Sequence, residues 1–220
     1  NLSRMLMSGF PIKALVLDTQ VYSNTGGQAC TSGFTGQVSD MAAYGKAWKG
    51  KEEVRKEMAL IGAAHRTAYV MQGSIANITH LLEGFIAGLN SRRPALFNIY
   101  AACQPEHGIG DDASAAQNKL AVESRAYPLF RFDPDAGTTF EECCDLDGNP
   151  AMDDDWPSYT IAYQDEKGRG ASMEVAMTFA DFAVTEGRFR KHFRKAPPDT
   201  WNDNMLPLHE LLELDTDERE

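Results

Sequence analysis

The sequence alternates short apolar runs with longer segments of helical periodicity, and this alternation limits the fold classes open to it. The runs are IKALVLD at 12–18, TAYVMQ at 67–72, ALFNIYAAC at 95–103 and YPLFRFD at 127–133. Unbroken apolar runs of this length are typical of strands buried on both faces of a parallel sheet. With helices between them, they predict an α/β fold with a doubly wound, mostly parallel sheet. An α+β arrangement of the same elements is the alternative.

Helical periodicity fills the stretches between these runs, with apolar side chains recurring on one helix face. Helices are expected at 38–48, 52–66, 74–91 and 113–124. Ser74 is the expected N-cap of the third helix, because a serine oxygen can accept hydrogen bonds from the free N–H groups of the first turn.

The chain changes character after the fourth apolar run. Residues 135–157 are acidic and rich in turn-forming residues, which predicts a loop or insertion. Residues 158–177 have the pattern of a β-hairpin, and 178–193 that of an amphipathic helix with Thr178 as N-cap. The expected organisation is an α/β binding domain at 1–134, the acidic insertion at 135–157, and a hairpin with helices at 158–220 that packs on the same domain.

Charge and cysteine usage exclude some classes of protein. The formal net charge of −11 argues against nucleic-acid binding, which needs a basic surface. No stretch reaches the roughly 20 apolar residues that span a bilayer, so no membrane segment is expected. Four cysteines are too few for a disulfide scaffold and favour a reducing compartment, which we take to be the cytoplasm. The chain starts without methionine, so we expect a piece of a longer polypeptide.

The segment DTQVYSNTGGQ, residues 18–28, follows the first apolar run and carries the clearest chemical signal. In open α/β sheets, ligands bind beyond the carboxyl ends of the strands. Thr19 and Asn24 offer side-chain oxygens there, and Val21 offers a backbone carbonyl. Such oxygens suit a hard divalent cation that also holds phosphate oxygens. An ordinary strand-to-loop turn is the alternative, because Asn-Thr-Gly-Gly is common in turns.

Gly26 and Gly27 add a second element to this signal. Glycine lets the backbone approach a phosphate closely, so we expect their N–H groups to face one. The sequence has no Walker lysine motif and no G-x-G-x-x-G, so nucleotide binding has little support.

LVLDTQVYSNTGGQ at 15–28 resembles the thiamine-diphosphate-binding segment of the pyruvate:ferredoxin (flavodoxin) oxidoreductases, which runs D-T-E-V-Y-S-N-T-G-G-Q. Three further segments are similar to that family: MAAYGK at 41–46, IYAAC at 99–103 and AVESRAYPLFRFDP at 121–134. TFADFAVTEGRFRKHF at 178–193 resembles a family helix more weakly. The resemblance covers residues 1–134 well, and it implies the thiamine-diphosphate-binding fold.

The resemblance implies a site for thiamine diphosphate held through Mg²⁺. The metal would be bound by the Thr19 side chain and the Val21 carbonyl, and Asn24 would be the catalytic residue, close to the diphosphate and the reacting 2-oxo acid. The third protein ligand, the aspartate of a Gly-Asp-Gly motif, would precede Asn1. The cofactor-binding residues would be Thr19, Gln20, Val21, Tyr22, Ser23, Asn24 and Thr25.

Cys103 matches a family cysteine that ligates a [4Fe–4S] cluster, with the other three cysteines outside this chain. Spacing alone makes Cys103 a small buried residue. The implied reaction is oxidative decarboxylation of a 2-oxo acid, pyruvate foremost, to acyl-CoA and carbon dioxide. The implied partners are the 2-oxo acid, coenzyme A, ferredoxin or flavodoxin, and the remaining domains of the polypeptide, with a homodimer at full length. The isolated chain is expected to be inactive.

Several residues depart from the family pattern. Gln20 replaces a glutamate, Thr31 stands where the family has a lysine, and 135–175 has no counterpart. Two alternatives therefore stay open: an enzyme for another 2-oxo acid, such as indolepyruvate or 2-oxoglutarate, and a non-catalytic domain that keeps the fold for assembly. His107 is the one histidine near the expected site, and no role is assigned to it.

Overall fold

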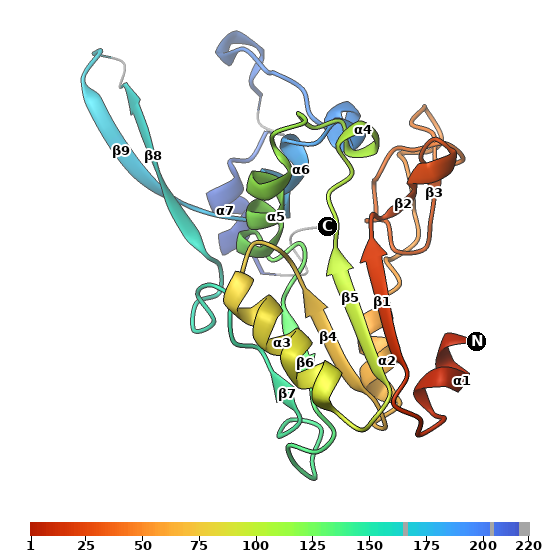
Figure 1. Ribbon diagram of the computed structural model, residues 1–220. Coiled ribbons are helices and arrows are strands. Elements are labelled where there is room, and N and C mark those ends of the chain that lie inside the picture. The colour runs from red at the N-terminus through yellow and green to blue at the C-terminus, as the bar shows by residue number, and fades with distance from the viewer. Residues whose placement is uncertain (165–166, 203–204, 216–220) are drawn as a thin grey trace.

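The computed structural model describes residues 1–164, 167–202 and 205–215 and contains a five-stranded sheet flanked by helices (Figure 1). Its strands run in the order β1 (Lys13–Asp18), β5 (Ala95–Tyr100), β4 (Tyr69–Gly73), β6 (Phe130–Phe132) and β7 (Cys144–Asp145). β1, β5 and β4 pair in parallel, whereas β6 and β7 are antiparallel. All the predicted apolar runs thus form strands of one sheet, and the predicted α/β class with a parallel-rich sheet is confirmed.

Helices lie on both faces of the sheet, where they pack on β4 and β5 (Figure 1). These helices are α2 (Met58–Ala64) and α3 (Ile78–Asn90). A Cβ on Gly62 of α2 would lie 2.9 Å from the Leu96 side chain. A Cβ on Gly88 of α3 would lie 2.6 Å from a ring atom of Phe97. Leu96 and Phe97 are neighbours in β5 and so point to opposite faces of the sheet. The doubly wound arrangement follows from these two contacts.

β1 is an edge strand, and it is buried on one face only. Ala14 and Val16 pack against the core together with α1 (Leu2–Leu6). Leu15 and Leu17 point to the other face and are 57% and 63% exposed. The expected burial of this run on both faces is therefore wrong for β1, because α3 packs on β4 and β5 rather than over the edge strand.

The segment before α2 is a loop where sequence periodicity predicts helices. Residues 38–48 form turns and isolated bridges, so the helix predicted there is wrong. Within the second predicted helix, 52–66, the only helical part is α2. The loop bonds to a distant part of the chain, since the N–H group of Val38 donates to the carbonyl of Arg188 at 2.9 Å. Such tertiary contacts override local helix propensity.

The N-cap of α3 is Asn77, whose side chain accepts a hydrogen bond from the His80 N–H at 3.0 Å. The predicted Ser74 cap is wrong, because the Ser74 hydroxyl donates instead to Asn118 Oδ1 at 2.8 Å. Asn118 lies on α5 (Ser114–Glu123), which confirms the fourth predicted helix.

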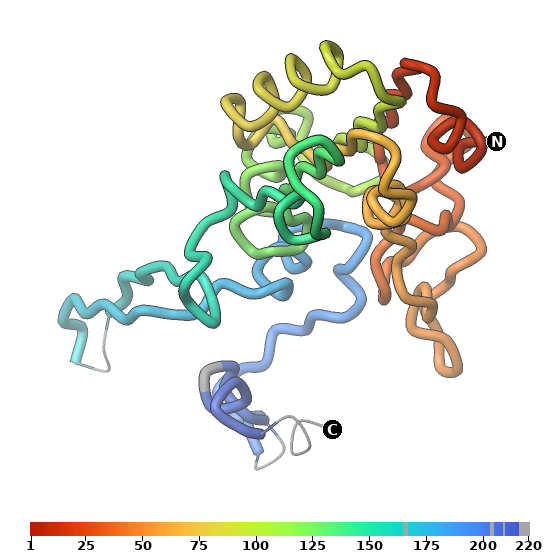
Figure 2. Tube along the Cα trace, turned by 90° about the horizontal axis from the view of Figure 1, so that it is seen from below, coloured from red at the N-terminus to blue at the C-terminus, as the bar shows by residue number. Residues whose placement is uncertain are grey.

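The predicted hairpin is confirmed as an antiparallel pair that extends away from the body of the molecule (Figure 2). Its strands are β8 (Ser158–Gln164) and β9 (Gly170–Ala176); residues 165–166 of the connecting turn lie outside the described residues. The elements that follow are α6 (Phe179–Val184), η2 (Gly187–His192), η3 (Pro198–Thr200) and α7 (Leu208–Glu213). Thr178 caps α6 as predicted, but the single helix predicted at 178–193 is broken before Gly187.

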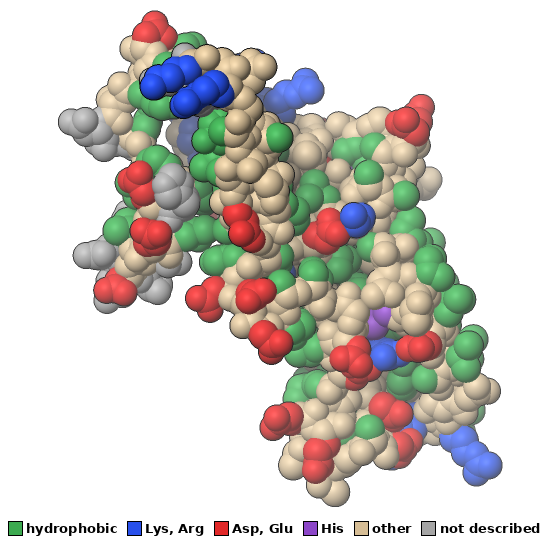
Figure 3. Space-filling model, turned by 90° about the vertical axis from the view of Figure 1, so that its left-hand side faces the viewer, with side chains coloured by type: hydrophobic (Ala, Val, Ile, Leu, Met, Phe, Trp, Pro, Cys, Tyr) green, Lys and Arg blue, Asp and Glu red, His purple; other side chains and the backbone are tan. Residues whose placement is uncertain are grey.

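An aromatic cluster joins this C-terminal segment to the end of the sheet. Its buried members include Phe34, Tyr100, Tyr127, Phe182 and Phe189. Acidic side chains are spread over the face shown in Figure 3, in keeping with the net charge. In the described part of the chain, no helix has the length and apolar character needed to cross a membrane.

Candidate functional site

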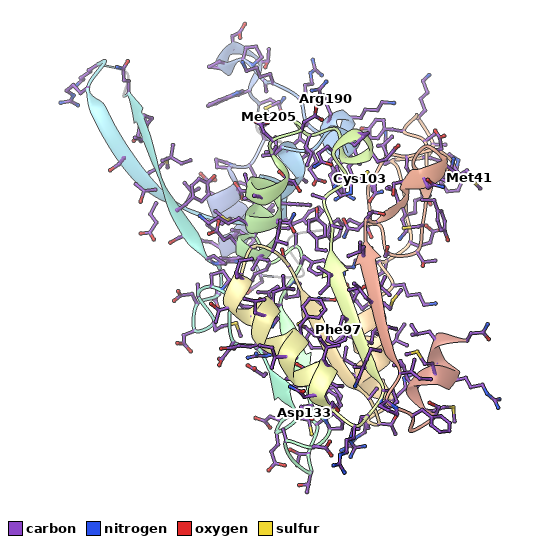
Figure 4. The ribbon with its side chains drawn as sticks, in the orientation of Figure 1. Met41, Phe97, Cys103, Asp133, Arg190 and Met205 are labelled. Atoms are coloured by element: carbon purple, nitrogen blue, oxygen red, sulfur yellow. The ribbon has the colours of Figure 1, made fainter. Side chains whose placement is uncertain are left out.

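The candidate site is the turn that follows β1, at the carboxyl edge of the parallel strands (Figure 4). Its elements are β2 (Val21–Tyr22), η1 (Ser23–Thr25) and β3 (Gln28–Ala29). The Asp18 carboxylate fixes the start of the turn, because Oδ1 accepts from the Gln20 N–H at 3.1 Å and from the Ser32 hydroxyl at 2.7 Å. The Asp18 carbonyl accepts from the Ala101 N–H at 3.0 Å, which ties the turn to the end of β5.

Thr19 and Val21 bring two oxygens together on this turn. The Thr19 hydroxyl donates to the Val21 carbonyl at 2.9 Å, and Ser23 Oγ lies 3.2 Å from Thr19 Oγ1. Adjacent ligands of an octahedral Mg²⁺ with bonds of 2.0–2.1 Å are separated by about 2.9 Å. The pair therefore fits two neighbouring coordination positions. If a cation binds both Thr19 Oγ1 and the Val21 carbonyl oxygen, the Thr19 hydroxyl can donate its hydrogen bond to Ser23 Oγ instead.

Asn24, Tyr22 and Thr25 form the outer side of the turn. Asn24 is exposed, and among the described residues none hydrogen-bonds its side chain. Tyr22 is 59% exposed. The Thr25 hydroxyl is held within the turn by the Gln28 side chain. Asn24 is thus accessible to a bound ligand.

Gly26 and Gly27 shape the turn through their backbone conformation. Both have positive φ, 100° and 87°, which side-chain-bearing residues rarely adopt. Their N–H groups donate to the carbonyls of Ser23 and Tyr22, at 3.2 and 3.1 Å. The expectation that these groups face a phosphate is therefore wrong: they close the turn. The Glu106 carboxylate lies against Gly27 and occupies the place where a Cβ would be.

Gln20, between the two candidate metal ligands, points into the protein. It is 1% exposed, and its φ is +59°. Its side-chain oxygen accepts from Arg188 Nη2 at 2.8 Å, and its carbonyl accepts from Gln37 Nε2 at 3.0 Å. Gln20 therefore fixes the turn from the inside, and whether it also contacts the cofactor stays a prediction.

His107 supports the same turn from α4 (Gln104–His107). Its Nε2 lies 2.8 Å from the Thr19 carbonyl, which can only accept, so Nε2 carries the proton. Its Nδ1 lies 3.4 Å from Glu186 Oε1, and both side chains are fully buried. Burial alone would raise the pKa of Glu186, but the Arg188 guanidinium and His107 hold it below its ordinary value.

No role for Glu186 or Arg188 was expected from the sequence, yet the two side chains form a buried ion pair behind the turn. Charged residues in an aromatic-rich amphipathic segment are ordinarily expected on its solvent-exposed face. The sequence therefore offered no reason to expect Glu186 and Arg188 in the interior. The helix expected at 178–193 is broken before Gly187, so Glu186 and Arg188 do not follow one helical repeat.

Cys103 lies three residues after the end of β5, at the same edge of the sheet as the turn (Figure 4). It is half-buried and a free thiol. In the part of the chain that the structure describes, no group of three or more His, Cys, Asp or Glu side chains could hold a metal ion.

Open space lies beside the turn. A cavity of about 780 Å³, lined mainly by apolar groups, borders Tyr22, Trp48 and Val54. A smaller, more polar hollow of about 380 Å³ borders Gly27 and Lys191. Both spaces border the turn that follows β1, through Tyr22 and Gly27, whereas Thr19, Val21 and Asn24 line neither of them.

A parallel-rich α/β sheet with an oxygen-bearing turn beyond its strand ends defines a class of ligand-binding α/β domains. Comparison with known proteins makes the assignment more specific, although no family model matches the sequence. The chain is 37% identical over 135 residues to the pyruvate:ferredoxin oxidoreductase of Moorella thermoacetica, a match that covers 61% of this chain and 11% of that protein. It is 33% identical to the pyruvate-flavodoxin oxidoreductase of Rhodospirillum rubrum, with the same coverage of 61% and 11%.

Two further relatives are more distant. A pyruvate synthase subunit of Thermotoga maritima is 29% identical over 59% of this chain and 40% of that subunit. The solved 2-oxoglutarate:ferredoxin oxidoreductase of Magnetococcus marinus has a TM-score of 0.42 at 17% identity, over 47% of this chain and 34% of that one. The sequence matches confirm the resemblance to pyruvate:ferredoxin and pyruvate-flavodoxin oxidoreductases over about 61% of the chain, which spans 11% of the length of the first two relatives.

Proposed function

We propose that this chain is the part of a 2-oxo acid:ferredoxin or flavodoxin oxidoreductase that holds the diphosphate end of thiamine diphosphate through Mg²⁺. The observation that carries the proposal is the 2.9 Å approach of Thr19 Oγ1 to the Val21 carbonyl within DTQVYSNTGGQ, beyond the strand ends. Hard oxygen donors at this spacing suit Mg²⁺, which binds diphosphates in enzymes.

Different residues of the turn would bind the metal and the substrate. Thr19 and Val21 would hold the metal, and the exposed Asn24 would contact the reacting 2-oxo acid. Bound thiamine diphosphate supplies the electron sink that decarboxylation of a 2-oxo acid requires. A further protein ligand to the metal would come from outside residues 1–220.

Cys103 would supply one thiolate of a [4Fe–4S] cluster that receives the electrons, before ferredoxin or flavodoxin takes them and coenzyme A takes the acyl group. In the same proposal, residues 1–134 form the cofactor-binding domain and 135–157 are an insertion. Residues 158–220 pack on that domain through α6 and η2, while the β8–β9 hairpin extends from it. The full-length enzyme would be a cytoplasmic homodimer, and the isolated chain would not turn over substrate.

The test is turnover by the full-length native protein. It should reduce ferredoxin or flavodoxin with pyruvate and coenzyme A, in a reaction that requires thiamine diphosphate and Mg²⁺. Asn24→Ala should lower kcat by about a hundredfold or more, as expected for a group that contacts the reacting substrate. Asn90→Ala, an exposed change at the far end of α3, is the control.

The outcomes separate the alternatives. Activity with indolepyruvate or 2-oxoglutarate but not with pyruvate would reassign the substrate. Absence of cofactor-dependent turnover with all three would reject the enzyme and favour a domain kept for assembly.

A further inference from the structure

Arg188 is a buried arginine whose guanidinium reaches the turn that carries Thr19 and Val21. It is 4% exposed. Its Nη2 donates to Gln20 Oε1 at 2.8 Å and its Nη1 donates to Gln37 Oε1 at 2.9 Å. One side chain from η2 thus holds two residues from the beginning of the chain.

The backbone of Gln20 needs such support. Its φ of +59° lies in the left-handed region, which is unfavourable for a residue with a side chain and persists only where the surroundings impose it. Three contacts do so here: the Asp18 carboxylate on its N–H group, Gln37 on its carbonyl and Arg188 on its side chain.

The backbone conformation of Gln20 determines how the Thr19 hydroxyl and the Val21 carbonyl are oriented. With the Gln20 side chain turned inward, the Thr19 hydroxyl and the Val21 carbonyl meet at 2.9 Å. We propose that Arg188 is a positioning residue for the cation site: it holds Gln20 in the left-handed conformation and so keeps the two oxygens at metal-binding spacing. This inference rests on the function proposed above.

The chemistry of Arg188 suits this role better than that of lysine. Its Nε donates to the Glu186 carboxylate while its two terminal nitrogens bond the two glutamines. A planar fork can make these bonds at once, whereas a lysine ammonium is a single point of contact. The rings of Phe34 and Phe189 lie 5.5 and 5.2 Å from the guanidinium carbon and limit its movement.

The first arm of the test measures the turn without any ligand. Hydrogen exchange of the amides at 18–29 is followed in the wild type, Arg188→Met and Arg188→Lys. We expect exchange to be faster by about tenfold in Arg188→Met, because a hydrogen bond to a charged group is lost, with an intermediate value in Arg188→Lys. Arg188→Lys keeps the positive charge opposite Glu186. If Arg188→Met does not fold, the exchange rates of Arg188→Lys alone test the inference.

The control for general destabilisation is Arg131→Lys. Arg131 lies on β6 and is paired with Glu83 and Asp145, away from the turn. This variant should lose stability without faster exchange at 18–29. Unchanged exchange at the turn in both Arg188 variants, or equal acceleration in Arg131→Lys, would overturn the inference.

The second arm measures thiamine diphosphate binding at saturating Mg²⁺ in the full-length native protein. Arg188→Lys should raise the Kd and the KM for the cofactor by about tenfold, while kcat at saturation stays within about twofold, because Arg188 does not touch the reacting atoms. Wild-type binding with an unchanged Kd in Arg188→Lys would overturn the positioning role. Absence of binding by the wild type would instead reject the proposed function, and the exchange arm would still decide the coupling of Arg188 to the turn.

Discussion

Gly108 and Gly187 are in direct backbone contact: a Cβ on Gly108 would lie 2.8 Å from the Cα of Gly187. Gly108 ends α4 and Gly187 begins η2, so this contact sets the end of one element on the start of the other. The residues next to them, His107 and Glu186, come within 3.4 Å as a result. The support behind the candidate cation site therefore depends on two residues that lack side chains.

Gly187→Ala should destabilise the fold, because its new methyl group would lie 3.0 Å from the Cα of Gly108 and backbone atoms cannot rotate away. We expect a loss of about 1–3 kcal/mol in the free energy of unfolding, as for other overpacked sites. Gly170→Ala is the matched control, since nothing lies within 4 Å of its Cβ position. Denaturant unfolding of both variants is the measurement, and equal stability of the two would contradict the expectation.

Alanine substitutions at Gly26 and Gly27 should separate backbone strain from crowding. Both glycines have positive φ, so each substitution should cost about 1–3 kcal/mol through strain. Gly27→Ala also displaces the Glu106 carboxylate, whereas nothing lies within 4 Å of a Cβ on Gly26. We expect an extra cost of about 0.5–1 kcal/mol for Gly27→Ala that disappears when Glu106 is also alanine. An extra cost that persists in the Glu106→Ala background would show that the crowding comes from elsewhere.

Thr178 should contribute measurably to the stability of α6. Its hydroxyl accepts from the Ala180 N–H at 3.2 Å, and the Asp181 carboxylate accepts from the Thr178 N–H at 2.7 Å. Thr178→Ala should lower the free energy of unfolding by about 1 kcal/mol, and Thr178→Ser should keep most of it. Equal thermal midpoints for wild type and Thr178→Ala would show that the cap is not needed.

The Glu142 carboxylate should give the chain an acid-dependent loss of stability. The N–H groups of Thr139 and Thr138 donate to it at 2.9 and 2.8 Å and lower its pKa to about 2 from an ordinary 4.5. Because the folded-state pKa is the lower one, the stabilisation is complete above about pH 4.5 and is lost as the pH falls toward 2. Glu142→Gln should remove this part of the pH dependence. A carboxyl carbon resonance of Glu142 that titrates near 4.5 would refute the assignment.

The sheet was predictable because short apolar runs separated by helical segments bury most of their side chains as neighbouring strands. The exposed face of β1 was not, because a run such as ALVL looks the same whether a helix covers one of its faces or both. The failed helix at 38–48 has a different cause: its backbone bonds are made to residues distant in sequence, as between Val38 and Arg188. Periodicity within a window contains no information about such partners.

The candidate site was predictable to the extent that its chemistry is local. Thr19, Val21 and Asn24 follow one another in a single turn, so the sequence places them together before any fold is known. The support from His107 and Arg188 depends on tertiary contacts and became visible only in the structure. A buried polar residue such as Gln20 cannot be distinguished in sequence from one that faces a ligand.

The central claim is that Thr19 and Val21 hold a divalent cation that binds thiamine diphosphate. Titration calorimetry of the full-length native protein with thiamine diphosphate at saturating Mg²⁺ tests it most directly, with wild type, Thr19→Ser and Thr19→Ala. Thr19→Ser keeps the hydroxyl and should bind like the wild type, whereas Thr19→Ala should bind about 10–100-fold more weakly. An affinity of Thr19→Ala equal to that of the wild type would contradict the account.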